Sequence, residues 1–202
     1  MWQALKKEFE KTGTILVDDG SELISAEKLA MLEDLSGSLP LEHVEIGDAN
    51  EPNYLDVGRF ITDVDKPTLV NRPSSDKALE IIKDKDFQKF FCYLLESDTL
   101  HVRRMQYNIL GEGCFVGLHL DTDSNPDYLI AVVIQFGDQF SGGEYVVYGG
   151  EQPPRRYAPG KNSIIISNCD YEHEVTKVTS GKRKSLVFFL SGSSGENTRL
   201  AS

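Results

Sequence analysis

The sequence contains a histidine and a carboxylate whose spacing suits metal binding. His119 and Asp121 are separated by one residue at the end of an expected strand. Side chains alternate along a strand with a period of two, so both would point to the same face. His173 lies 173 − 119 = 54 residues further on, at the start of another expected strand. Two histidines and one carboxylate can bind Fe(II) on one side and leave positions open for substrate and oxygen.

A basic residue follows the second histidine in the sequence. Arg183 comes ten positions after His173 and is flanked by Lys182 and Lys184. Such a run is usually solvated, but in a strand the two lysines face one way and the arginine faces the other. If the lysines face solvent, Arg183 points inward. Ser185 would share its face and could donate a hydrogen bond beside it.

The first hundred residues indicate helices. These helices would support the strands that carry the candidate metal ligands and Arg183. Apolar residues recur there with helical spacing. Prolines and glycines between residues 37 and 73 predict loops and short strands. The expected helices cover residues 2–11, residues 25–35 and two segments between 74 and 95, with Ser74 or Ser75 as an N-cap and a break at Asp84.

The next ninety residues indicate strands without helices between them. Short runs of β-branched and aromatic residues alternate with turn residues, which is typical of an antiparallel sandwich or jelly roll. We therefore expect a mostly β fold, a double-stranded β-helix (jelly roll) covered on one side by the N-terminal helices. The expected strands are 101–110, 114–120, 129–136, 144–148, 162–167, 173–178 and 184–190.

Length predicts one domain over residues 1–202. Within it, residues 1–100 would support a catalytic core at 102–190, and residues 191–202 would form a tail.

Together these motifs resemble the Fe(II)/2-oxoglutarate-dependent dioxygenases, in the branch similar to prolyl 4-hydroxylases. The resemblance covers about residues 102–190 and rests on the His-x-Asp motif, the distal histidine and the arginine ten positions later. It also includes Tyr107 upstream, Gly142-Gly143-Glu144 at the opening of a middle strand, and Pro159-Gly160 before another.

The resemblance implies a role for each matching residue. A guanidinium matches a carboxylate in bidentate geometry, which suits the distal carboxylate of 2-oxoglutarate. The implied cofactors are Fe(II), 2-oxoglutarate and O2, with ascorbate as a candidate reductant. The implied sites are Fe(II) on His119, Asp121 and His173, and 2-oxoglutarate on Arg183, Ser185 and Tyr107, with core packing as the alternative for Tyr107.

The resemblance also implies the reaction. Related halogenases have a small residue at the carboxylate position, so Asp121 argues for hydroxylation or another oxidation. We expect oxidation of an unactivated C–H bond in a small amino-acid-like or peptide-like metabolite, with release of succinate and CO2. One alternative is a prolyl-type hydroxylase of protein side chains, and another is a jelly-roll metal-binding protein that does not use 2-oxoglutarate.

The substrate pocket is expected between the N-terminal region, residues 121–128 and residues 149–158. A substrate carboxylate would need a cation there. The candidate arginines are Arg155, Arg156 and Arg104, with Arg72 and Arg103 as further options.

Charge and cysteine content limit the partners. Lys plus Arg is 21 and Asp plus Glu is 32, a net charge of −11, which disfavours nucleic acid and anionic membranes. Three cysteines without a CxxC motif, and no signal-like N-terminus, predict free thiols and a cytoplasmic protein. His43 and His101 have no matching partners and are interpreted as structural. The oligomeric state is left open.

Overall fold

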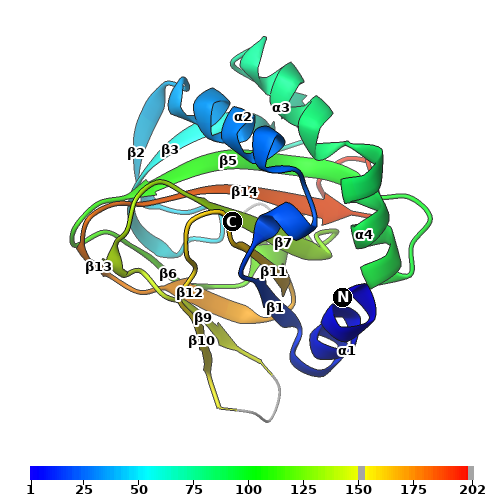
Figure 1. Cartoon of the computed structure of the whole chain (residues 1–202). Helices are drawn as coiled ribbons and strands as arrows, with labels where there is room; N and C mark the ends of the chain where they lie inside the picture. The colour runs from blue at the N-terminus through cyan, green and yellow to red at the C-terminus, as the bar shows by residue number, and fades with distance from the viewer. Residues whose placement is uncertain (150–152, 200–202) are drawn as a thin grey trace.

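The computed structural model describes residues 1–149 and 153–199, and most of its elements are antiparallel strands (Figure 1). The helices are α1 (Trp2–Thr12), the 3-10 turn η1 (Gly20–Glu22), α2 (Ala26–Gly37), α3 (Ser74–Ile82), α4 (Lys85–Leu95) and α5 (Asp121–Ser124). The strands are β1 (Thr14–Val17), β2 (Leu41–Ile46), β3 (Pro52–Asp63), β4 (Pro67–Leu69), β5 (His101–Leu110), β6 (Phe115–His119), β7 (Ile130–Phe136), β8 (Ser141–Gly142), β9 (Tyr145–Tyr148), β10 (Arg155–Tyr157), β11 (Ile164–Asn168), β12 (Glu172–Val175), β13 (Val178–Ser180) and β14 (Arg183–Ser191).

Strand β3 joins the two halves of the β structure. Its residues 56–61 pair with β5, whereas Asn53 and Tyr54 pair with β6. The sheet therefore continues in the order β1-β11-β7-β14-β5-β3-β6-β12-β9-β10, with β2 and β4 also paired to β3. The two halves face each other and enclose an interior, as in a jelly roll. The predicted jelly-roll core with helices on one side is confirmed.

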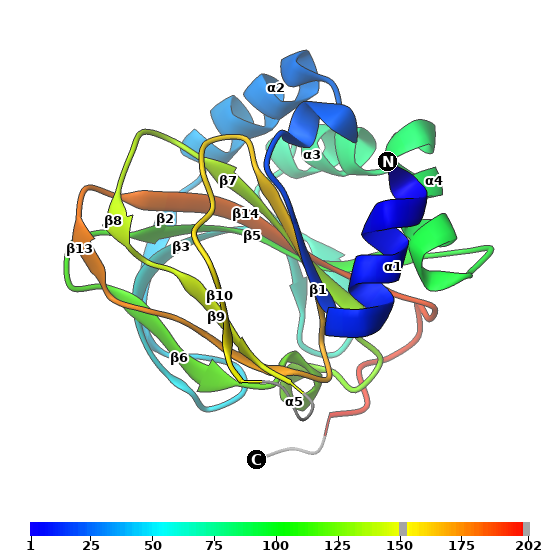
Figure 2. The same cartoon turned by 60° about the horizontal axis from the view of Figure 1, so that its bottom comes forward.

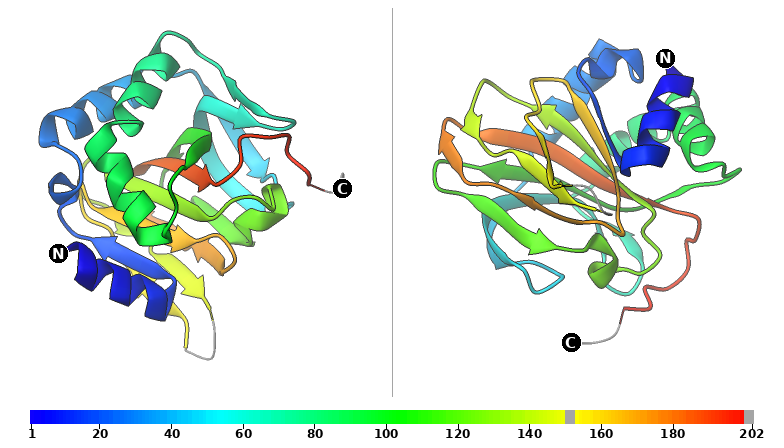
Figure 3. Two further views of the ribbon diagram at one scale, coloured as in Figure 1. Left: turned by 90° about the vertical axis from the view of Figure 1, so that its right-hand side faces the viewer. Right: turned by 90° about the horizontal axis from the view of Figure 1, so that it is seen from below.

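The helices cover the outer face of the larger half (Figures 1 and 3). Phe87 and Phe91 of α4 pack edge-on against Phe188 of β14, with ring centroids 6.3 and 6.1 Å apart. Trp2 of α1 packs against Phe90 at 5.5 Å. The phenylalanines belong to the main core cluster between the helices and the sheet, and the partly buried Trp2 packs against it. Each buried aromatic of this kind stabilises the fold by about 1.5–3 kcal/mol.

Two helix starts show where local chemistry decided the boundaries. Asp84 accepts hydrogen bonds from the backbone N–H of Asp86 and Phe87, at 3.1 and 3.2 Å, and so begins α4 at the expected break. Helix α3 begins at Ser74 without a side-chain cap, so the expected Ser74 or Ser75 cap is wrong. The Ser75 hydroxyl instead donates back to the carbonyls of the preceding turn.

Strand β3 is longer than the sequence indicated. Loops and short strands were expected between residues 37 and 73, but β3 alone spans 12 residues. Pro52 stands at its first position, where a missing N–H costs little. Gly58 lies where Leu39 crosses the strand, because an added Cβ would come within 2.8 Å of the Leu39 Cβ. Neither residue therefore interrupts the strand: Pro52 begins it, and Gly58 lets Leu39 pack closely against it.

The expected runs after residue 100 are strands, but one of them is divided. The short strands β1, β8 and β10 were not expected, and neither was the short helix α5 between β6 and β7. The run 173–178 splits into β12, which pairs with β6 and β9, and β13, which pairs with β8. Figure 2 shows α5 at the end of the strands, directly beyond β6. Within the described residues, the structure has no helix with the length and apolar character that a membrane span requires.

Candidate active site

Strands β6 and β12 bring the two predicted histidines side by side. His119 and His173 are register partners in the antiparallel pairing, and their ring centroids are 4.3 Å apart. Asp121 begins α5, and its Oδ1 and Oδ2 lie 3.4 Å from His119 Nε2 and 3.6 Å from His173 Nε2. One ligand atom from each residue lies within 4.8 Å of the other two. This cluster has the size and composition of a site for a single metal ion.

Main-chain carbonyls orient both imidazole rings. His119 Nδ1 lies 2.8 Å from the carbonyl of Gly117, and His173 Nδ1 lies 3.0 Å from the carbonyl of Tyr171. A carbonyl only accepts, so each Nδ1 carries a proton and Nε2 is the nitrogen of each ring that faces Asp121 and is left to bind a metal. Such hydrogen bonds to the far nitrogen are the usual support of metal-binding histidines.

The electrostatics of the trio match a cation between them. Burial lowers the pKa of His119, but the hydrogen bond and charge of Asp121 outweigh it and raise that pKa to about 9. Burial lowers the pKa of His173. Asp121 Oδ2 is buried and has no hydrogen-bond partner among the described residues. A carboxylate oxygen in this state fits a divalent ion, which would replace the proton on His119.

A buried network holds the turn that carries Asp121. Asn125 ends α5, and its Nδ2 donates to Asp63 at 2.8 Å. Tyr128 donates to the same carboxylate at 3.1 Å. Arg103 donates to both oxygens of Asp63, at 3.1 and 3.0 Å, and both side chains are fully buried. Arg103 is thus a structural residue, which corrects its place among the candidate substrate arginines.

Arg183 points into the same pocket, as its alternation with the flanking lysines predicts. Its residue exposure is 2%, and its Nε and Nη2 have no partner among the described residues. Burial lowers the pKa of Arg183 to about 10. A buried cation without a counter-charge is costly. The pocket therefore offers a site for an anion beside the trio of His119, Asp121 and His173.

The comparisons with known proteins decide the family. The sequence model of the family described as the 2OG-Fe(II) oxygenase superfamily matches residues 105–191 of this chain. The chain is similar to an oxidoreductase of the 2OG-Fe(II) oxygenase family from Burkholderia pseudomallei, with 35% identity, a TM-score of 0.92, and coverage of 100% of this chain and 95% of that one. The chain belongs to the 2OG-Fe(II) oxygenase family. It is an enzyme, and the family uses Fe(II), 2-oxoglutarate and O2.

More distant structures share the fold of this oxygenase. A non-haem α-ketoglutarate-dependent epimerase of nogalamycin biosynthesis has 12% identity and a TM-score of 0.70, with coverage of 94% of this chain and 81% of that one. A prolyl hydroxylase from Trichoplax adhaerens, in complex with a hypoxia inducible factor peptide, has 10% identity and a TM-score of 0.67, with coverage of 94% and 88%. No curated protein matches the chain by sequence.

Two further polar side chains lie near Arg183 in this oxygenase. Ser185 is fully buried between the pocket-lining residues Arg183 and Val187, and its hydroxyl has no partner among the described residues. Tyr145 stacks on His173 with centroids 5.0 Å apart, and its buried hydroxyl is also without a partner there. Sequence reasoning missed Tyr145, although it directly follows the Gly-Gly-Glu motif.

Tyr107 lies on the opposite face of its strand, which corrects its expected position beside the cosubstrate. Arg104, Gln106 and Asn108 of β5 line the pocket. Alternation then turns Tyr107 toward the helices, where it is 4% exposed within the main core cluster. Core packing, the alternative for this residue, is what the structure shows.

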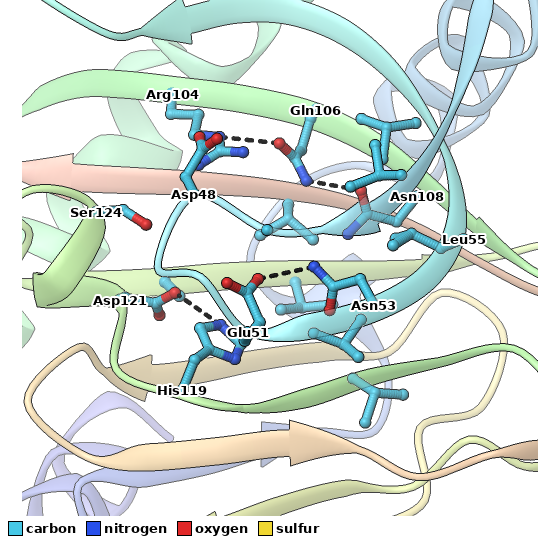
Figure 4. Close-up of a pocket in the computed structure, with 18 of the residues that line it drawn as sticks. Asp48, Glu51, Asn53, Leu55, Arg104, Gln106, Asn108, His119, Asp121 and Ser124 are labelled. Atoms are coloured by element: carbon cyan, nitrogen blue, oxygen red, sulfur yellow. Dashed lines mark hydrogen bonds and ion pairs between the residues drawn. The ribbon is translucent and has the colours of Figure 1, made fainter. Parts of the chain in front are cut away.

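The β2–β3 hairpin closes the other side of the pocket (Figure 4). Its Asp48 pairs with Arg104 at 2.6 Å. Arg104 Nε donates to Gln106 at 2.9 Å, and Gln106 Nε2 donates to Asn108 at 2.8 Å, which forms a polar ladder along β5. Of the candidate substrate arginines, Arg104 thus lies in the pocket. The hairpin also contributes Glu51, which the sequence did not single out.

The other arginine candidates lie away from the pocket. Arg155 donates to the carbonyl of Thr12, at the end of α1, and Arg156 pairs with Glu144 at 2.8 Å on the surface. Strand β10, which carries both arginines, pairs only with β9 at one end of the sheet order. The structure therefore corrects both expectations.

The expected lining segment 149–158 also differs. Residues 150–152 lie outside the described part of the chain, and the remaining residues of the segment do not line the pocket. Arg72 forms an exposed ion pair with Asp76 at 2.6 Å. The pocket takes its outer wall from residues 44–59 instead. His43 and His101, interpreted as structural, do not line it either.

Proposed function

We propose that this oxygenase hydroxylates or otherwise oxidises an unactivated C–H bond in a small amino-acid-like or peptide-like molecule. In this proposal His119, Asp121 and His173 hold Fe(II), and Arg183 binds the distal carboxylate of 2-oxoglutarate. Ser185 and Tyr145 donate hydrogen bonds to the same cosubstrate.

One observation carries the proposal. The pocket contains a buried guanidinium with two unpartnered nitrogens, Nε and Nη2 of Arg183, next to three convergent metal-ligand side chains. An anion that binds both the arginine and a metal would compensate the buried charge and complete the coordination. A short diacid such as 2-oxoglutarate has the two carboxylates that this arrangement requires.

When bound, Fe(II) and 2-oxoglutarate supply the oxidising chemistry, with succinate and CO2 as by-products. The protein supplies orientation. The carbonyls of Gly117 and Tyr171 fix the two imidazoles, and the α5 turn fixes the Asp121 carboxylate. Apolar side chains such as Val133 and Phe189 form part of the pocket wall.

The pocket supports a small substrate over a folded protein. It has a volume of about 870 Å³, counting its open mouth. The ion pair between Asp48 and Arg104 ties the hairpin to β5 and narrows the space beside His119. The hairpin and β5 thus form two walls of the pocket, which favours a small or extended molecule over a folded surface.

The test is spectroscopic and kinetic. Anaerobic addition of Fe(II) and 2-oxoglutarate to the wild-type protein should give a visible charge-transfer band, which His119→Ala abolishes. Arg183→Ala should keep Fe(II) binding and raise the KM for 2-oxoglutarate about 10- to 100-fold, since it removes charged hydrogen bonds.

The matched control is Arg156→Ala, which removes a surface guanidinium outside the pocket. It should change neither Fe(II) binding nor the KM for 2-oxoglutarate. Iron-dependent turnover without 2-oxoglutarate would contradict the proposal. An unchanged KM for 2-oxoglutarate in Arg183→Ala would contradict the role of Arg183.

A further inference from the structure

The outer half of the pocket contains one carboxylate without a cation. The charged residues that line the pocket are Asp48, Glu51, Arg59, Arg104, Asp121 and Arg183. Arg104 pairs with Asp48 at 2.6 Å, and Arg59 pairs with Glu42 at 2.5 Å. Asp121 and Arg183 belong to the proposed iron and 2-oxoglutarate sites. Among the described residues, no Lys, Arg or His lies within ion-pair distance of Glu51, although its charge reaches His119 and helps to raise the pKa of that histidine.

Glu51 is nevertheless buried. Its exposure is 9%, and its carboxylate accepts two hydrogen bonds from neutral donors. One comes from the backbone N–H of Ala49 at 3.1 Å, and the other comes from Asn53 Nδ2 at 2.8 Å. A carboxylate can accept about four hydrogen bonds, so half of its capacity remains. Burying an ionised carboxylate without a counter-charge is costly.

The hairpin holds Glu51 in a defined place relative to the proposed iron site. Asn53 donates to Glu51 and accepts from the backbone N–H of Gly117 at 3.2 Å. The carbonyl of that same Gly117 accepts from His119. The carboxylate is thus linked through Asn53 and the main chain of Gly117 to a predicted iron ligand. Figure 4 shows Glu51 between Asn53 and the pair of His119 and Asp121.

The hairpin turn packs against one side of the Glu51 carboxylate. An added Cβ at Gly47 would lie 1.6 Å from Glu51 Oε1, so the hairpin backbone packs directly on the carboxylate. Glu51 also lines the pocket, so the acceptor positions that the hairpin leaves unused are open to a molecule bound there.

We propose that Glu51 binds a protonated amine of the substrate, so that this oxygenase acts on small molecules that carry a cationic amino group. The inference rests on the proposed function and specifies its substrate class. An ammonium group has up to three donors for the free acceptor positions and supplies the missing counter-charge. The ladder of Arg104, Gln106 and Asn108 opposite would contact the polar remainder of the molecule.

A first experiment tests the class directly. The wild-type enzyme, with Fe(II), 2-oxoglutarate and O2, is given a mixture of free amino acids, short peptides and simple amines, and separately the N-acetylated forms of the same compounds. Mass spectrometry then follows oxidised products, and succinate is measured alongside. Product from the free amines and not from the acetylated forms is expected. No product from the amine mixture, or equal product from both, would overturn the inference.

A second experiment tests the residue. With the amine that is oxidised, Glu51→Gln should raise the KM for that amine about 10- to 100-fold, because a charged hydrogen bond becomes a neutral one. Glu51→Asp keeps the charge and should retain more affinity. Glu45→Gln is the matched control, since it removes an exposed carboxylate from the same hairpin and should behave as wild type.

The readouts separate this inference from the proposed function. The charge-transfer band and the KM for 2-oxoglutarate should be unchanged in Glu51→Gln, which also shows that the variant is folded. An unchanged KM for the amine would overturn the role of Glu51. Absence of the band in the wild-type protein would instead refute the proposed function.

Discussion

Replacement of Asp63 by Asn tests the network that holds the metal-binding turn. The Asp63 carboxylate accepts four hydrogen bonds, two from Arg103 and one each from Asn125 and Tyr128. Asp63→Asn preserves the shape but removes the charge and one acceptor oxygen. The Arg103 guanidinium would remain fully buried, with the carbonyl of Ser193 as its other partner.

The expected loss of stability is large. Removing one partner of a buried ion pair costs about 3–5 kcal/mol, because the other charge stays desolvated. For a chain of 202 residues, each kcal/mol lowers Tm by about 2–4 °C. Asp63→Asn should therefore lower Tm by roughly 6–20 °C. Because Asn125 loses part of its anchor and ends α5, Fe(II) affinity should fall as well.

Thermal unfolding and anaerobic Fe(II) titration measure the two effects. Asp76→Asn is the control, since its ion pair with Arg72 is exposed and solvent weakens it, so Tm should hardly move. Adding Arg103→Met to Asp63→Asn should restore part of the lost stability, because the uncompensated charge is gone. A Tm of Asp63→Asn within 2 °C of wild type would show that the Asp63–Arg103 pair does not stabilise the fold.

Three further substitutions probe separate features. Gly143→Ala should lower Tm and raise the KM for 2-oxoglutarate several-fold, because Gly143 has φ +62 and an added Cβ would lie 3.1 Å from Arg183 Cδ; an unaltered KM would refute this. Tyr145→Phe removes an unpartnered buried hydroxyl, so Tm should hold or rise while the KM for 2-oxoglutarate increases, and an unchanged KM would exclude contact with the cosubstrate. Asp84→Ala should cost at least about 1 kcal/mol in chemical denaturation, because it removes the α4 cap and the ion pair with Lys28 at 2.6 Å; Asp86→Ala, which keeps the backbone N–H that bonds to Asp84, is the smaller control.

The inner part of the site was predictable from the sequence because its geometry is local. One residue separates His119 from Asp121, and their convergence follows from strand alternation and the turn that begins there. Arg183 could be oriented because its lysine neighbours indicate the solvent side of β14. The pairing of His173 with His119 needed the topology that the family resemblance implied.

The outer part of the site was not predictable from the sequence, because it depends on which face of β5 lines the pocket and on how β3 packs. Strand β5 is buried on both sides, so its hydrophobic pattern does not tell which of Gln106 and Tyr107 faces the pocket. Pro52 and Gly58 made β3 look like loop, although one opens the strand and the other allows Leu39 to cross it. Glu51 and Asp48 reach the pocket only because that strand exists.

The main-chain anchors of the histidines affect how this oxygenase can change during evolution. A carbonyl cannot be removed by substitution, so the orientation of His119 and His173 does not depend on any one side chain being retained. Its sensitive point is Gly117, where an added Cβ would come within 2.4 Å of the Pro52 carbonyl and push β6 from β3. Libraries that vary the β2–β3 hairpin while keeping Pro52 and Asn53 could therefore alter substrate preference and leave the oxidising centre intact.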